Sequence, residues 1–253
     1  MHASVVQFAL FFLLGGAIGF FGGLFGVGGA IVSIPVLAVA FGMSEQQAQG
    51  TSLLMVVSNV VVALWRYNRE QKIDWRMGAY LATVAIPFSY LGAHLATELP
   101  ERIVRYAFAS FVIAIAAFMA WRTGRALAPR AEPLPFVFVG VVGAISGFMA
   151  GAFGIGGAMF TIPAMSVFFG LSQVAAQGQA LVLAVPGALV GLVTYTVARD
   201  VAWLVGIALA LGGCTTVVWG AHVAHRLSDR TLRWLWICFL LVAATALILR
   251  KSS

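Results

Sequence analysis

The stretch Gly23-Leu24-Phe25-Gly26-Val27-Gly28-Gly29-Ala30 returns 128 residues later as Gly151-Ala152-Phe153-Gly154-Ile155-Gly156-Gly157-Ala158. The same offset relates further pairs without a gap, among them Pro35 and Pro163, Gln49 and Gln177, Tyr67 and Tyr195, Trp75 and Trp203, and His94 and His222. The chain therefore contains two related halves. Internal repeats of apolar segments are typical of secondary transporters, in which the substrate binds where the repeats meet.

The composition places most of the chain in lipid. Of its 253 residues, 62% are hydrophobic and 9% are charged, whereas a soluble domain carries about a quarter charged residues. A spanning helix needs ~20 mainly apolar residues. Runs of about this length cover residues 5–24, 48–65, 75–96, 103–121, 136–153, 175–197, 203–224 and 232–249. Because these runs are apolar on all sides and do not alternate as barrel strands do, the sequence predicts an all-α polytopic membrane protein.

Several function classes find no support in the residue pattern. The net charge of +7 comes mostly from short loops, where membrane topology explains it, so we expect no nucleic-acid partner. Cys214 and Cys238 lie in apolar runs without metal-ligand spacing. The sequence has no P-loop, no nucleophile elbow and no metal-type His/Glu spacing. We therefore expect neither an enzyme nor a bound cofactor or metal.

Each half divides into five segments, which gives eight to ten membrane segments in all. The first segment carries glycine at every fourth position, as at Gly15, Gly19 and Gly23, so one helix face allows close packing. The second segment covers 30–41 in the first half and 158–169 in the second. It rises only ~18 Å, against a hydrocarbon core of ~30 Å, and it contains a proline. This segment is therefore predicted to be short or broken.

The later segments set the boundaries of the two halves. Ser44 and Ser172 are predicted N-caps of the third segments. The fourth segments are predicted to start near Trp75 and Trp203, and the fifth near Arg102 and Arg230. The predicted units are a first transmembrane repeat at 1–125, a connector at 126–134 and a second transmembrane repeat at 135–253.

The basic loops change place between the halves. In the first half the excess of basic residues lies at 66–76, and in the second half it lies at 226–233. Basic loops favour the cytoplasm. If both loops and the connector 126–134 face the cytoplasm, the two repeats have opposite orientation. The sequence thus predicts inverted repeats in the cytoplasmic membrane, with a cytoplasmic connector.

The glycine-rich stretches are predicted to interrupt backbone hydrogen bonding inside the membrane. Such a break is tolerated where it borders protein or a water-filled cavity. The short helix after each break presents free N–H groups and a partial positive charge at its N-terminus, which suits an anion. Gly28, Gly29, Gly156 and Gly157 are therefore predicted to bind a small anion between the halves. Close packing alone is the alternative for the same glycines.

Polar side chains near the breaks extend the predicted site. Gln49 and Gln177 match across the halves, and a buried amide can donate to an anion without the desolvation cost of a buried cation. The further candidates are Ser33, Thr161, Thr51 and Gln179. For the two hydroxyls one turn into the short segments, at 33 and 161, bonding to carbonyls of their own helix is the alternative.

The matched ionisable and aromatic residues receive separate predictions. His94 and His222 are candidates for proton coupling, and an ordinary interfacial histidine is the alternative. The predicted interfacial anchors are Tyr67, Tyr195, Trp75 and Trp203. No acid lies at the centre of an apolar run. Because cation transporters usually carry such an acid, this pattern favours an anionic or neutral substrate.

The chain resembles the sulfite exporter TauE/SafE family, also called the TSUP transporters. The resemblance rests on Gly22–Gly29 through Pro35, on Ala48-Gln49-Gly50-Thr51-Ser52-Leu53, and on their second copies. It implies a multi-pass transporter of sulfur-containing anions such as sulfite, sulfoacetate or other organosulfonates, often an exporter. The second Ala-Gln-Gly motif continues with Gln179-Ala180 in place of Thr-Ser, so the two sides of the site need not be equivalent.

These observations lead to one functional prediction. The chain is predicted to lie in the lipid bilayer and to export a small sulfur-containing anion by alternating access at a site between the repeats. Protons are the candidate coupling ion, through His94 and His222. The alternatives are a passive anion channel and a non-transporting membrane scaffold. The sequence does not specify an oligomeric state.

Overall fold

The computed structural model describes residues 5–124, 134–153 and 157–249, which form ten α-helices and no strand. The helices are α1 (Val5–Phe25), α2 (Ala30–Ala40), α3 (Glu45–Glu70), α4 (Trp75–Glu98), α5 (Glu101–Gly124), α6 (Phe138–Phe153), α7 (Ala158–Phe168), α8 (Gln173–Val197), α9 (Trp203–Arg226) and α10 (Asp229–Leu249). By length and hydropathy, six of the described helices could cross a membrane: α1, α3, α4, α8, α9 and, over Arg102–Trp121, α5. The prediction of an all-α polytopic membrane protein is confirmed.

Matching helices begin at matching residues. The starts of α2 and α7, of α4 and α9, and of α3 and α8 are each separated by the 128-residue offset seen in the sequence. The predicted starts at Trp75 and Trp203 are confirmed, and α5 and α10 each begin one residue before the predicted arginine. The predicted connector at 126–134 lies, except for Leu134, outside the described residues.

Serine caps explain why α3 and α8 begin where they do. The Ser44 Oγ accepts a hydrogen bond from the backbone N–H of Gln47, at 3.1 Å. The Ser172 Oγ accepts one from the backbone N–H of Ala175, at 3.2 Å. Each cap satisfies one of the N–H groups that lack a partner within the first helical turn. Both predicted N-caps are confirmed.

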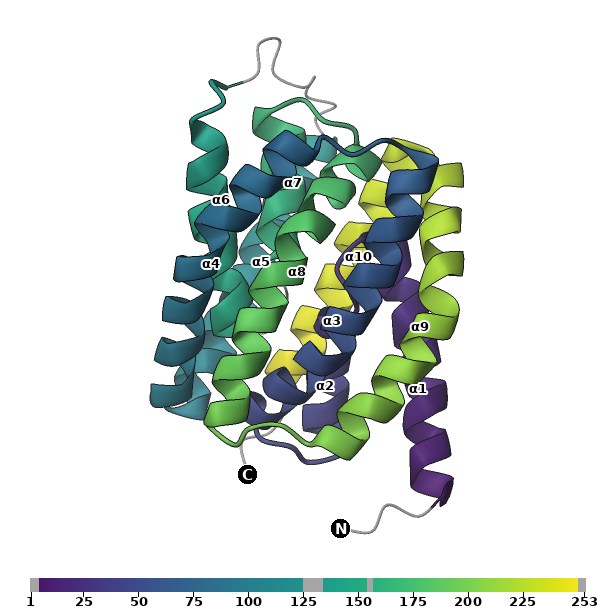
Figure 1. Ribbon diagram of the computed structural model, residues 1–253, viewed down its shortest axis with the longest axis vertical. Helices are drawn as coiled ribbons and strands as arrows, with labels where there is room; N and C mark the ends of the chain where they lie inside the picture. Colours follow the sequence, from purple (N-terminus) through teal and green to yellow (C-terminus); the bar gives the residue numbers. More distant parts are fainter. Residues whose placement is uncertain (1–4, 125–133, 154–156, 250–253) are drawn as a thin grey trace.

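The two short helices turn back inside the bundle. As Figure 1 shows, α1 rises from one end of the molecule to about half its height, and α2 returns to the same end. The helices α6 and α7 make the same hairpin from the opposite end. Each short helix thus runs back toward the end of the bundle from which the preceding helix comes.

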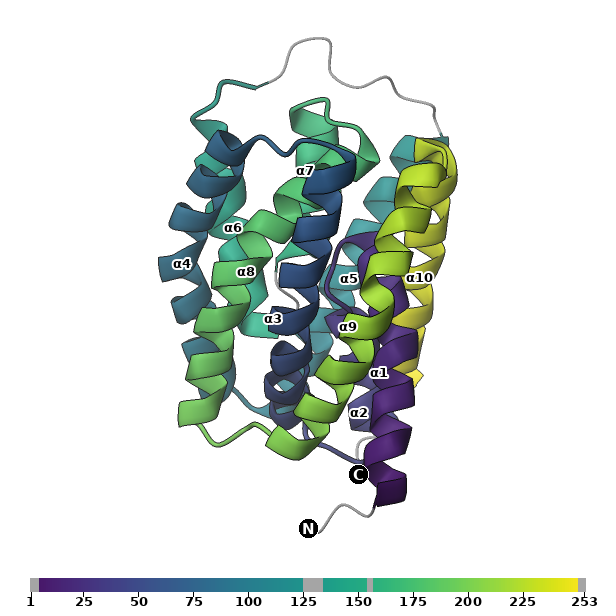
Figure 2. The same cartoon turned by 45° about the vertical axis from the view of Figure 1, so that its right-hand side comes forward.

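Matched helices run in opposite directions along the bundle. In both views α3 and α9 run toward the end at the top of the picture, whereas α8 and α4 run away from it (Figures 1 and 2). The long helices α3 and α8 lie in contact at the centre, and α5 and α10 lie in contact behind them.

Glycine faces interlock the two halves. A Cβ added to Gly19 would collide with the backbone of Gly213 on α9, and one added to Gly147 would collide with the backbone of Ala85 on α4. Thus α1 packs on α9, and α6 packs on α4. The predicted packing role of these glycines is confirmed, and the partner of each glycine-rich helix is the fourth helix of the other half.

One end of the bundle, called here the basic end, collects most of the described basic side chains. The loops α3–α4 and α9–α10 both lie there (Figure 1), and His222 Nδ1 is 3.0 Å from Glu70 Oε1. The basic residues at the basic end are Arg66, Arg69, Lys72, Arg76, Arg226, Arg230 and Arg233, and the acidic residues there are Glu70, Asp74 and Asp229. The opposite end, called the far end, holds the loops at 41–44, 99–100 and 198–202.

Candidate functional site

Gln177 lies against the break in the first half. Its side chain is fully buried, and a Cβ added to Gly26 would lie 2.7 Å from the Gln177 Cβ. The Tyr67 hydroxyl donates to Gln177 Oε1 at 2.9 Å, with the carbonyl of Gly23 as a second acceptor at 2.9 Å. The Gln177 Nε2 donates to the carbonyl of Leu24 at 3.4 Å. A glutamine from the second half is therefore held at the end of α1.

Gln49 occupies the matching place in the second half. It is fully buried, and its Oε1 accepts from the Tyr195 hydroxyl at 2.6 Å. The same hydroxyl lies 3.5 Å from the carbonyl oxygens of Gly151 and Ala152, at the end of α6. Among the described residues, the Gln49 Nε2 has no hydrogen-bond partner. A buried donor without an acceptor costs about 1–3 kcal/mol, so we expect this group to have an acceptor that the described residues do not supply.

The two glutamine–tyrosine pairs cross between the halves. Gln49 and Tyr67 come from α3, and their respective partners Tyr195 and Gln177 come from α8. The prediction that the tyrosines are interfacial anchors is wrong, because Tyr67 is 1% exposed and Tyr195 is 0% exposed. A sequence signal was present, since the tyrosines recur at the same offset as the glutamines.

The break in the first half needs glycine for its backbone geometry. Gly28 and Gly29 have φ angles of 70° and 101°, in the left-handed region that side chains with a Cβ disfavour. Gly29 precedes α2 without a side-chain cap, and no backbone acceptor is found among the described residues for the N–H groups of Ala30 and Ile31. These N–H groups are buried at a helix N-terminus, where the macrodipole favours negative charge.

In the second half, the corresponding helix α7 starts after Gly157, whose φ is 75°. The predicted residue Gly156 lies outside the described residues.

Asn59 is a residue that the sequence analysis missed. It is fully buried, and its Nδ2 donates to the carbonyl of Gly28 at 3.1 Å. This bond holds the break against α3. The matching position in the second half is Gly187, so no such amide is available there. The absence of a repeat partner hid Asn59 from a search based on matched pairs.

The hydroxyls of Ser33 and Thr161 are engaged by the protein. Ser33 Oγ lies 2.7 Å from Ser52 Oγ and 3.3 Å from the carbonyl of Ala30. Thr161 Oγ1 lies 2.8 Å from Ser146 Oγ and 3.1 Å from the carbonyl of Gly157. Both residues hold a short helix in place, and the bonds to their own helix match the alternative stated for them.

Thr51 and Gln179 join the halves at opposite ends. The Thr51 Oγ1 accepts from the backbone N–H of Ala202 at 2.9 Å, next to the start of α9. The Gln179 Nε2 donates to the backbone carbonyl of Asp74 at 3.1 Å, next to the start of α4. Gln49 precedes Thr51 and Gln177 precedes Gln179 by two positions on the same helices, so the four side chains form one group near the start of α3 and another near the start of α8.

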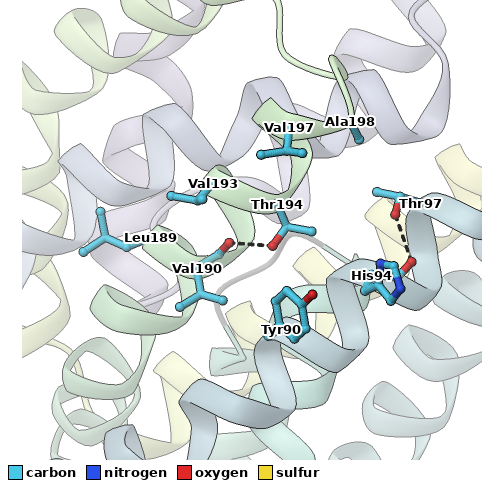
Figure 3. A pocket seen from close by; sticks show the side chains of 9 residues that line it. All are labelled: Tyr90, His94, Thr97, Leu189, Val190, Val193, Thr194, Val197 and Ala198. Carbon is cyan, nitrogen blue, oxygen red and sulfur yellow. Dashed lines mark hydrogen bonds between the residues drawn. The ribbon is translucent and has the colours of Figure 1, made fainter.

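The two predicted histidines lie toward opposite ends of the bundle, and each follows a residue that packs on a glycine-rich helix, Ala93 on Gly151 and Ala221 on Gly23. Figure 3 shows His94 on the surface of α4, where it stacks on Tyr90 and lines a groove of about 610 Å³ against α8. Its Nε2 is 3.3 Å from Glu98 Oε1. His222 lies at the basic end, between Arg66 and Glu70. Their part in proton coupling stays a prediction.

Neutral donors dominate the site. Amides, phenol hydroxyls and backbone N–H groups surround the breaks. Among the described residues, the hydrogen bonds of the two glutamine–tyrosine pairs join the side chains to one another and to backbone carbonyls. Such a set can bind an anion by hydrogen bonds alone, without the desolvation cost of a buried cation.

Comparison with known proteins agrees with this picture of a membrane transporter. A family model described as "Sulfite exporter TauE/SafE" matches residues 11–247. The chain is 31% identical over 166 residues to a probable membrane transporter protein of Methanocaldococcus jannaschii, covering 62% of this chain and 61% of that protein. It is 28% identical to a probable membrane transporter protein of Xylella fastidiosa, covering 85% of this chain and 84% of the other. No solved structure matches the chain.

A longer match comes from Bacillus subtilis, whose probable membrane transporter protein YunE is 24% identical over 251 residues. That match covers 90% of this chain and 92% of the relative.

Proposed function

Because the chain belongs to the sulfite exporter TauE/SafE family of membrane transporters, we propose that it is a secondary transporter that exports a small sulfur-containing anion. Sulfite, sulfoacetate and other organosulfonates are the proposed substrates. The observation that carries the proposal is the pair of buried glutamines at the breaks, each held by a tyrosine of the other half; the Nε2 of Gln49 has no partner among the described residues. Sulfite and sulfonate oxygens accept hydrogen bonds from such donors.

The proposed orientation places the basic end in the cytoplasm. Basic loops favour that side of the membrane. The two basic loops predicted from the sequence, at 66–76 and 226–233, lie together at this end. With matched helices running in opposite directions, the two halves then form inverted repeats. The connector at 126–134 would lie on the cytoplasmic side.

The proposed mechanism is alternating access around the paired breaks. Each glutamine is held by a tyrosine of the other half. A displacement of one half against the other would therefore move the donors relative to both breaks. Such rocking about a fixed central site is the way inverted-repeat transporters expose a substrate to each side in turn.

Transport of ³⁵S-labelled sulfite and of sulfoacetate into liposomes tests the proposal. We expect saturable transport by the wild type. Removing a hydrogen bond to a charged ligand costs about 1.5–3 kcal/mol. Gln49→Leu and Gln177→Leu should therefore lower kcat/KM by about 10- to 100-fold.

Gln46→Leu is the matched control, because Gln46 Nε2 donates to the carbonyl of Leu99, away from the breaks. Thermal unfolding of each purified variant shows whether it is folded. If folded Gln49→Leu and Gln177→Leu transport as well as the control, the glutamines do not bind the substrate. If the wild type transports no member of the panel, the substrate class is wrong.

A further inference from the structure

A cavity of about 190 Å³ leads from the basic end toward the breaks. Its rim is formed by the exposed residues Gln71, Lys72 and Asp74 on the loop between α3 and α4. Its base is formed by buried residues, among them Tyr67 and Gly178. Because the Tyr67 hydroxyl bonds Gln177, the cavity ends one side chain away from the candidate site.

At the far end, the matching glycine and the residue after it are packed against the loop before α9. A Cβ added to Gly50 would collide with the backbone carbonyl of Asp200, and Thr51 Oγ1 accepts from Ala202 N–H at 2.9 Å. At the basic end, a Cβ added to Gly178 would first meet a side-chain atom, Ile73 Cγ1, at 3.3 Å. Matched glycines thus have backbone contact at one end and a cavity at the other.

A second cavity at the far end shares part of this lining and differs in how deep it reaches. It measures about 480 Å³ and lies between the start of α1, the loop at 41–43 and the start of α9. Its lining residues Met43, Gln47 and Ala202 match Leu171, Ala175 and Asp74 of the cavity at the basic end. It extends along α3 as far as Gln47, and its lining includes neither Gly50 nor Thr51 nor Tyr195. The cavity at the basic end, by contrast, is lined by Tyr67, the residue that matches Tyr195.

Charge also differs between the matched positions. Lys72 lines the rim at the basic end, whereas the residue 128 positions later is Asp200, at the far end. The carboxylate of Asp74, beside Lys72, accepts from the backbone N–H groups of Arg76 and Met77 and so caps α4. Lys72 is the basic side chain among the lining residues of this cavity. The cavity at the basic end is thus lined by one cation, Lys72, beside a carboxylate that caps a helix, whereas the position matching Lys72 carries an acid at the far end.

We propose that this cavity is the access site through which a sulfite or sulfonate anion reaches the breaks from the basic end, with Lys72 attracting it. The contacts of Gly50 and Thr51 with residues 200–202 keep the far end closed in the same conformation. The inference rests on the proposed function for the identity of the anion. The one-sided access does not depend on that identity.

Thiol labelling tests the one-sided access without any ligand. Gln179→Cys and Thr51→Cys occupy matched positions, and both are made in a chain whose Cys214 and Cys238 are replaced by alanine. A membrane-impermeant maleimide is added to vesicles of each orientation. We expect Cys at 179 to react from the basic side about tenfold faster than Cys at 51 reacts from either side, as a minor open state would allow.

Equal labelling of the two cysteines, or faster labelling at position 51, would overturn the proposal. One-sided labelling together with no transport of sulfite or sulfoacetate by the wild type would instead reject the proposed substrates and leave the access site standing. The two failures are thus distinguishable.

Transport kinetics with sulfite test the role of Lys72. Rim charges act mainly on the rate of encounter with a charged ligand. Lys72→Gln should therefore raise the KM for sulfite offered at the basic side about threefold or more, with kcat unchanged. Arg69→Gln is the matched control, because Arg69 is exposed at the same end and packs over Trp65, outside the cavity lining. Equal KM values for Lys72→Gln and Arg69→Gln would show that Lys72 does not attract the anion to this cavity more than another basic residue at the same end.

Discussion

The two ends of the central helix pair α3 and α8 carry the same sequence signals and pack differently. At the far end Gly50 lies against the backbone of Asp200. At the basic end the matching Gly178 faces the side chain of Ile73 across a cavity of about 190 Å³. The duplicated sequence therefore determines which helices and loops are in contact at each end. The conformation determines whether that contact is tight, as at Gly50, or borders a cavity, as at Gly178. A transporter with inverted repeats is expected to exchange these two arrangements.

The largest effect is expected where the two halves pack alike. Gly19→Val and Gly147→Val each place a side chain into the backbone of the helix opposite. Overpacking of this kind costs about 3 kcal/mol at the upper end of its usual range, so both variants should unfold at much lower temperature or fail to accumulate. Thermal unfolding in detergent measures this loss. Gly16→Ala is the control, because its Cβ would meet Gly212 O at an ordinary 3.7 Å. A tolerated variant at 19 or 147 would show that the helices are not in this close contact.

The next effect separates the two ends. Gly50→Ala should lower the free energy of unfolding by about 1–3 kcal/mol, because its Cβ meets a carbonyl of the backbone. Gly178→Ala should lower the free energy of unfolding by less, because the side chain of Ile73 can shift by the few tenths of an ångström that the new Cβ requires. Unfolding of both variants in the same detergent makes the comparison. Equal losses would contradict the difference in packing between the ends.

A smaller difference is expected between the two tyrosines. Tyr195→Phe leaves Gln49 with neither its Oε1 nor its Nε2 paired among the described residues. Tyr67→Phe leaves Gln177 with its bond to the carbonyl of Leu24. We expect each variant to lose about 1 kcal/mol of stability, with the larger loss for Tyr195→Phe. The free energy of unfolding of both single variants and of the double variant measures this difference. A larger loss of stability for Tyr67→Phe than for Tyr195→Phe would contradict the prediction.

The smallest effect concerns pH at the far end. Burial raises the pKa of the Asp200 carboxyl above its ordinary value. Because ionisation is harder in the folded chain than in the unfolded one, the folded state is disfavoured as pH rises from the ordinary value of 3.8 through the raised pKa. Below that window Asp200 is protonated in both states and has no such effect. The melting temperature of the wild type should therefore fall relative to Asp200→Asn across the window and stay level above it. A difference independent of pH would contradict this prediction.

Much of the local structure could be predicted because its causes are local. Ser44 and Ser172 cap the helices that follow them, and Gly28 and Gly29 allow a break that other residues would resist. Gln49 and Gln177 were predicted at the breaks from their cost in lipid. The tyrosines were misread because a phenol at the end of an apolar run looks like an interfacial anchor. Their burial depends on helices of the other half, which no local pattern reveals.

By itself, the sequence determined the ten helices, the two breaks and the repeat that relates them, because hydrophobic runs, caps and glycines act over one or a few turns. The tertiary structure alone decided that each glutamine is held by a tyrosine of the other half and that the basic end holds the cavity. Those outcomes depend on how the two halves interlock. Contacts between residues more than one hundred positions apart are set by packing of the whole bundle, and matched sequences can pack in two different ways.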